Sequence, residues 1–110
     1  MATESSHSVL AGRLRRRVVE TGVISAELRE GAMHAGGAEH DDLGAPYDVL
    51  ARTIGTASHR VTDAQVSAVR EASGSDRATF EIVMSASVGA GLKRWDAAAR
   101  AIREAEDAAR

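Results

Sequence analysis

The sequence predicts an all-α fold: a single compact domain of about five helices, with a long helix at the C-terminus. Three observations lead to this prediction. Apolar residues recur every three or four positions over long stretches, which is the period of one helix face. The residues around Thr62 and Gly74 have the pattern of a helix start and a helix stop. No stretch requires the alternation of apolar and polar residues that is typical of a strand.

Length and composition place the chain among ordinary globular proteins. Its 110 residues suit one small domain, and 44% of them are hydrophobic and 27% charged. We expect residues 1–6, which are polar, to be a disordered tail and residues 7–110 to form the domain. Only 3% of the residues are aromatic, so the core has to be built from Ala, Val, Leu and Ile. A thin core of this kind gains from oligomerisation.

Charge and residue usage exclude several classes of function. The net charge of −2 argues against nucleic-acid binding, which requires a basic surface. The chain has no cysteine, which excludes disulfides, thiolate nucleophiles and cysteine-ligated metals. No run reaches the roughly 18 apolar residues of a membrane helix, and the N-terminus lacks the apolar region of a signal peptide. We therefore expect a cytoplasmic protein with no membrane partner, no nucleic-acid partner and no cofactor.

The first helix is predicted from a single apolar stripe. Leu10, Leu14 and Val18 recur every four residues, which indicates a helix over about 8–20. Gly22 ends the stripe.

The second helix is predicted from its cap. Ser25 can accept a hydrogen bond from the first helical turn, and Leu28 would point inward. The helix ends near Gly31 or at 36–37. A loop over 35–45 follows, because this segment is rich in glycine and acidic residues and has no apolar period.

The third helix begins at Pro46, which suits a first helical turn because its missing N–H is not needed there. Gly55 is expected to weaken the last turn. The residues of the inner face are Tyr47, Leu50, Ala51 and Ile54.

The fourth helix has the clearest boundaries. Thr62 and Gln65 form a capping box, in which each side chain can satisfy a backbone donor of the other. Val66 and Val69 face the core. Gly74 is the residue expected just past a helix end.

The fifth helix starts at Ser75 or Asp76 and runs to the C-terminus. Small residues over 85–91 allow a second helix to approach closely, or could form the floor of a small-ligand site. The apolar stripe of this amphipathic helix is Phe80, Met84, Val88, Gly91, Trp95, Ala98, Ile102 and Ala105.

The stretch VTDAQVSAVREASGSDRATFEIVMSASVGAGLKRWDAA, residues 61–98, resembles the carboxymuconolactone decarboxylase and alkylhydroperoxidase D-like superfamily. The matching pattern is a V-T-D helix start, a Gly-Ser-Asp turn, F-E-I in the next helix and then A-S-V-G-A-G-L-K-R. The likeness covers about residues 43–103. It implies an alkylhydroperoxidase D-like all-α fold that assembles as trimers or hexamers.

The resemblance also implies what this chain lacks. Redox members of the superfamily carry C-x-x-C-x-x-x-H and an upstream glutamate. Here His59, Thr62 and Val66 fall at the two cysteine positions and the histidine position, and Tyr47 falls near the glutamate position. Thiol peroxidase and disulfide reductase activity are therefore excluded.

Three residues are candidates for catalysis. His59 could act as a general acid or base, because an unperturbed histidine titrates near neutral pH. Tyr47 and Glu81 could share a site with it. The alternative is structural: His59 packs near a helix start, Tyr47 belongs to the core, and Glu81 is solvated or paired with an arginine. The candidate pocket residues are Thr62, Val66, Met84 and Val88.

Two other clusters are weaker candidates. The arginines at 13 and 15–17 could touch an anionic partner, but they are interpreted as a solvated face. We expect no metal site in the loop region, because the spacing of its donors matches no rigid motif. Those donors are His34, His40, Asp41 and Asp42.

Two functions are therefore expected from the sequence. The first is an oligomeric module that binds a small organic molecule or serves assembly, without thiol redox activity. The second is a cofactor-independent decarboxylase or isomerase of a small acid or lactone, with His59 as the general acid/base.

Overall fold

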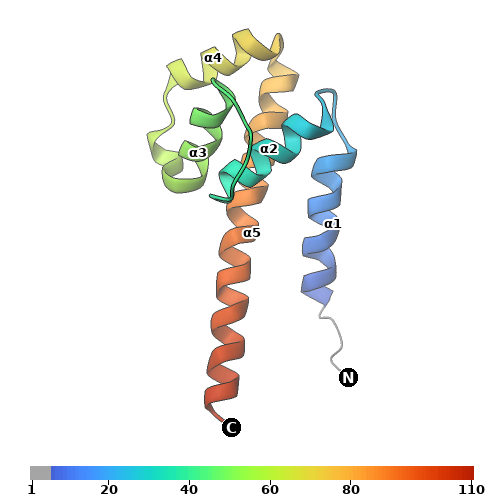
Figure 1. Ribbon diagram of the computed structural model, residues 1–110, viewed down its shortest axis with the longest axis vertical. Helices are drawn as coiled ribbons and strands as arrows, with labels where there is room; N and C mark the ends of the chain where they lie inside the picture. The colour runs from blue at the N-terminus through green and yellow to red at the C-terminus, as the bar shows by residue number, and fades with distance from the viewer. Residues whose placement is uncertain (1–5) are drawn as a thin grey trace.

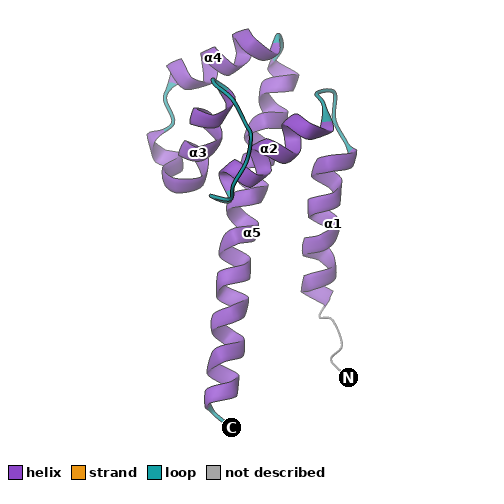
Figure 2. Ribbon diagram, viewed as in Figure 1, coloured by secondary structure: helices purple, strands orange, loops and turns teal. Residues whose placement is uncertain are grey.

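A computed structural model describes residues 6–110; its regular structure is helical, with no strand in the part described (Figures 1 and 2). The predicted all-α fold with five helices and a long C-terminal helix is confirmed. A single 3₁₀ turn, η1 (Ser58–Arg60), precedes the fourth helix. The helices are α1 (Ser6–Glu20), α2 (Ala26–Gly36), α3 (Tyr47–Ala57), α4 (Asp63–Ser73) and α5 (Asp76–Ala108).

The helices are arranged around α5. Figure 1 shows α2, α3 and α4 gathered at the N-terminal half of α5, while the C-terminal half projects from this body. α1 runs beside α5 in the opposite direction. Ser6, which was expected to belong to the tail, is the first residue of α1; residues 1–5 lie outside the described part.

Three helix starts are fixed by the side chains that the sequence indicates. Ser25 accepts a hydrogen bond from the Leu28 amide at 3.1 Å. Thr62 and Gln65 form both bonds of the capping box. Ser75 starts α5 by accepting a bond from the amide of residue 78. Each cap stabilises its helix by about 1 kcal/mol. Gly74 ends α4 at φ 88°, a left-handed conformation that favours glycine.

The core is small and is built from aliphatic side chains. Leu50, Val69 and Ile82 are its largest fully buried side chains. Alanines from α2, α3 and α5 fill the space between them. Within residues 6–110, no buried side-chain nitrogen or oxygen lacks a hydrogen-bond partner.

Glycines let three helices cross in near contact. A Cβ on Gly36 would overlap the carbonyl of Ala86, and one on Gly89 would overlap the carbonyl of Met33. A Cβ on Gly55 would overlap the carbonyl of Gly36. Gly55 stands in the last turn of α3, which ends at Ala57, and this glycine is needed where α3 crosses α2.

The apolar stripe of α5 is not the face that packs on the body. The buried side of α5 carries mostly small residues, together with Glu81, Ile82 and Leu92, whereas Phe80 and Met84 on the stripe are exposed. Small residues lie on the core side of α5 where α2 crosses it, because a side chain at Gly89 would overlap the backbone of α2. The large side chains of the stripe are left on the opposite side of the helix.

Candidate functional site

The three residues proposed for catalysis lie at different places. His59 is exposed on η1 and lines none of the grooves described below. Tyr47 is half-buried at the start of α3 and lines a groove beneath the loop before it. Glu81 is buried on α5 and lines a groove between α1 and α5. No groove described here joins any two of them.

The four proposed pocket residues also divide into two pairs. Thr62 is exposed and caps α4. Val66 is partly buried against the core. Met84 and Val88 line the groove between α1 and α5, together with Glu81. The structure therefore brings together three of the predicted site residues, all of them on α5.

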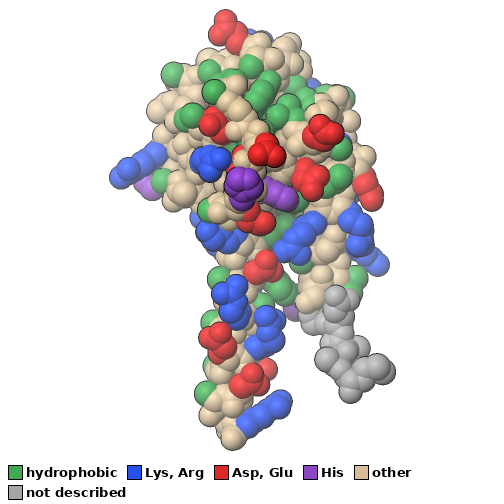
Figure 3. Space-filling model, in the orientation of Figure 1, with side chains coloured by type: hydrophobic (Ala, Val, Ile, Leu, Met, Phe, Trp, Pro, Cys, Tyr) green, Lys and Arg blue, Asp and Glu red, His purple; other side chains and the backbone are tan. Residues whose placement is uncertain are grey.

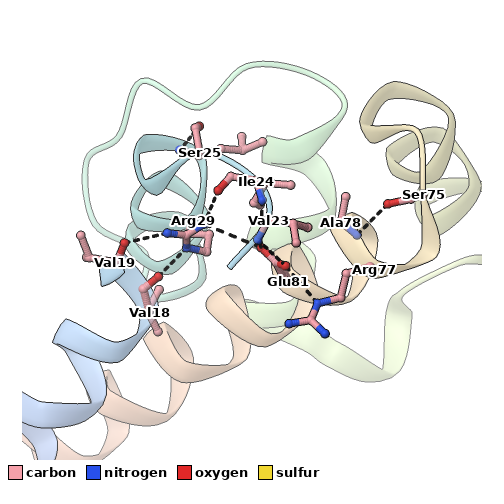
Figure 4. A network of polar contacts seen from close by, with 11 residues as sticks. Val18, Val19, Val23, Ile24, Ser25, Arg29, Ser75, Arg77, Ala78 and Glu81 are labelled. Carbon is pink, nitrogen blue, oxygen red and sulfur yellow. Dashed lines mark hydrogen bonds and ion pairs between the residues drawn. The ribbon is translucent and has the colours of Figure 1, made fainter. Parts of the chain in front are cut away.

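Glu81 is held by a dense set of donors (Figure 4). The amide of Val23 lies 2.9 and 2.8 Å from its two carboxylate oxygens, and the amide of Ile24 lies 3.1 Å from Oε1. Arg77 donates through Nε at 3.1 Å. Although the residue is only 7% exposed, its charge is thus solvated by the protein itself.

Arg29 completes this network, and the sequence reading did not single it out. Its side chain donates to the carbonyls of Val18 at 2.6 Å and Val19 at 2.7 Å, and also to the carbonyl of Ile24. Its Nη1 lies 3.7 Å from Glu81 Oε1. The two side chains therefore fix the end of α1 and the turn after it onto α5. No local sequence pattern marks Arg29, because its partners are backbone carbonyls at the end of α1 and the distant Glu81.

The environment of Glu81 favours the carboxylate. Burial by itself raises the pKa of this carboxyl, but hydrogen bonds from the Val23 and Ile24 amides and from Arg77, with the Arg77 charge, hold the pKa below its ordinary value. A general acid at neutral pH needs the opposite shift. Both carboxylate oxygens are already engaged, so this arrangement suits a structural anchor.

The groove between α1 and α5 has a volume of about 240 Å³ and mostly apolar walls. Leu14 and Val18 of α1 form one wall, and Phe80, Met84 and Val88 of α5 form the other. Arg29 and Glu81 close its floor.

Large apolar side chains around this groove are exposed. Leu10 is 54% exposed, Leu14 45%, Phe80 57% and Met84 45%. Trp95 and Ile102, one and two heptads after Val88, lie on the same side of α5. We call this surface the outer face; it consists of Leu10, Leu14, Val18, Phe80, Met84, Val88, Trp95 and Ile102.

A larger groove, about 700 Å³, lies between α2 and the loop after it. Its lining is acidic, and Figure 3 shows red and purple side chains gathered on this side of the body. The side chain of Asp41 is already bound by Arg52 at 3.0 Å and by the Leu43 amide at 2.8 Å. Within residues 6–110, no three His, Asp or Glu side chains are placed to hold one metal ion.

The arginines of α1 do not act as one cluster. Arg15 forms an exposed ion pair with Asp96 at 3.0 Å, which links α1 to α5 a second time. Arg17 instead lines the groove of the outer face. None of the helices over residues 6–110 is long and apolar enough to cross a membrane.

Comparisons with known protein families, with curated proteins and with solved structures find no match to this chain. The resemblance to the carboxymuconolactone decarboxylase superfamily therefore stays a prediction.

Proposed function

We propose that this protein is a self-assembling helical module and that its outer face docks on a second copy of the chain. The observation that carries the proposal is the exposure of Leu10, Leu14, Phe80 and Met84 on two adjacent helices. Contiguous apolar surface of this kind marks interaction sites in soluble proteins. Fully burying a side chain of this kind contributes about 1.5–3 kcal/mol, and the exposed half of each of these side chains is still to be buried, so several together support a stable complex.

The Arg29–Glu81 network supports the proposal, because it gives the outer face a fixed shape. α1 has few other attachments to α5, apart from the exposed pair of Arg15 with Asp96. The buried network holds the end of α1 against α5, so that both helices present one preorganised surface. Preorganisation reduces the entropy lost on association.

A small-molecule site fits the groove less well. Ligand pockets usually enclose about 300–1,000 Å³, whereas this groove is about 240 Å³ and open along its length. Its exposed walls extend beyond the groove to Leu10 and Ile102, which a small ligand would leave uncovered. The enzyme alternative has no supporting geometry either, because His59 lies apart from both grooves.

Two matched variants test the proposal. Met84→Glu places a charge on the outer face, and Val49→Glu places the same charge on α3, where the side chain is similarly exposed at 49%. Light scattering at equal concentrations should show association for the wild type and Val49→Glu and its loss for Met84→Glu. Equal masses for all three proteins would refute the outer face as the interface.

A further inference from the structure

We infer that the second copy pairs antiparallel, α5 against α5, so that Val88, Trp95 and Ile102 of one copy each meet a small residue of the other. This inference rests on the proposed function, because it specifies how the two copies meet. The pairing places Trp95 against the partner's Ala98, Gly91 against the partner's Ile102, and Val88 against the partner's Ala105.

The order of side-chain sizes along α5 favours an antiparallel pair. Large and small residues alternate at steps of three and four, which is a heptad pattern. In a parallel pair in register, large residues would meet large ones and small would meet small, leaving both clashes and voids. Antiparallel pairing in this register removes both, because Val88, Trp95 and Ile102 then each face a small residue. The alternating residues are Val88, Gly91, Trp95, Ala98, Ile102 and Ala105.

The fold of a single chain gives no reason for a glycine at position 91. Gly36, Gly55 and Gly89 each permit a backbone contact that a Cβ would block. A Cβ on Gly91 would meet nothing within 4 Å, and the residue is exposed in the middle of α5. Glycine weakens a helix relative to alanine. Close approach of the partner's Ile102 supplies the reason for a glycine at this position.

The projecting half of α5 leaves room for such a partner. Most residues from 97 to 110 are exposed, and Figure 1 shows this part of the helix extending away from α2, α3 and α4. Because the same surface is used by both copies, the contact is isologous and closes as a dimer.

Nitroxide labels test the orientation directly, since the chain has no cysteine of its own. Ala101→Cys and Ala108→Cys carry the label at two exposed positions one heptad apart on the same side of α5. In the antiparallel dimer, moving the label from 101 to 108 lengthens the axial part of the intermolecular distance by about 21 Å, twice the rise of seven residues. In a parallel dimer the two distances would be equal.

The outcomes separate this inference from the proposed function. A dimer with a much longer distance at 108 than at 101 supports antiparallel pairing. A dimer with equal distances overturns it and leaves self-assembly standing, whereas an unlabelled protein that stays monomeric refutes both. Light scattering checks each labelled protein. Should a label prevent association, Ala97→Cys and Glu104→Cys repeat the test one heptad apart on the solvent side of α5.

Discussion

Glu81 and Arg29 face each other in the interior, with Arg29 Nη1 3.7 Å from Glu81 Oε1, and each also binds the backbone of the segment that joins α1 to α2. Arg29 takes the free carbonyls at the end of α1, and Glu81 takes the free amides of the turn that follows. Groups that a helix end leaves unpaired are thus satisfied by two buried charges. The position of α1 on α5, and with it the outer face, depends on this pair.

Loss of the Glu81 charge is predicted to destabilise the fold strongly. Glu81→Gln leaves the Arg29 guanidinium buried without a counter-charge and turns an amide donor toward the backbone amides of Val23 and Ile24. Breaking one side of a buried pair costs about 3–5 kcal/mol, which urea unfolding can measure. Glu30→Gln is the control, since Glu30 is exposed and lies 3.9 Å from His34. A loss under about 1 kcal/mol for Glu81→Gln would contradict the role assigned to this network.

The same carboxylate predicts a pH dependence of stability. The pKa of Glu81 in the folded protein lies below its unfolded value, so the unfolded chain binds more protons in the interval between the two. The stability that Glu81 contributes is complete above the unfolded pKa of about 4.3 and is lost as the pH falls through the folded pKa. The free energy of unfolding of the wild type minus that of Glu81→Gln should therefore be constant from about pH 6 to 8, a range that begins roughly two pH units above the unfolded pKa. The difference should shrink in acid. A difference that grows in acid would contradict the sign of this pKa shift.

Gly89 and Gly91 are predicted to respond oppositely to alanine. Both substitutions are made with Met84→Glu, so that folding is measured apart from association. Gly89→Ala forces a Cβ into the carbonyl of Met33 and should destabilise by about 1–3 kcal/mol. Gly91→Ala meets open space and should stabilise α5 by up to about 1 kcal/mol. Thermal melting compares the two, and similar losses for both would show that Gly91 has a packing role within one chain.

Trp95 is predicted to report association without any substitution. It is the single tryptophan of the chain and is half-buried on the outer face. Docking of a second copy removes water from the indole, so dilution should shift its emission to longer wavelength as the copies separate. Met84→Glu should show the shifted emission at every concentration, and Val49→Glu should follow the wild type. An emission maximum independent of concentration in an associated protein would place Trp95 outside the interface.

Local signals made most of the fold predictable from the sequence. Ser25, Thr62 and Gly74 act within one or two helical turns, so their patterns identify helix ends without knowledge of the tertiary structure. The stripe of α5 also gave the correct helix. Its orientation could not be read, because the choice between Ile82 and Phe80 as core residues depends on where Gly36 and Gly89 let α2 cross.

The candidate site was less predictable, for a related reason. Spacing along the chain could suggest that His59, Tyr47 and Glu81 share a pocket, but only the three-dimensional arrangement separates them. The structural alternative for Glu81, an ion pair with an arginine, is confirmed. Its partners include Arg29, which lies far from Glu81 in the sequence and is brought to it by the turn after α1.

The most direct test of self-assembly through the outer face is the molar mass of the unmodified protein in solution, measured by light scattering over a dilution series. Antiparallel pairing predicts twice the 11.5 kDa mass of the chain at micromolar concentration, falling toward one chain mass on dilution. A mass of 11.5 kDa at every concentration would contradict the account, because the exposed Leu14, Phe80 and Met84 would then have no partner of their own kind.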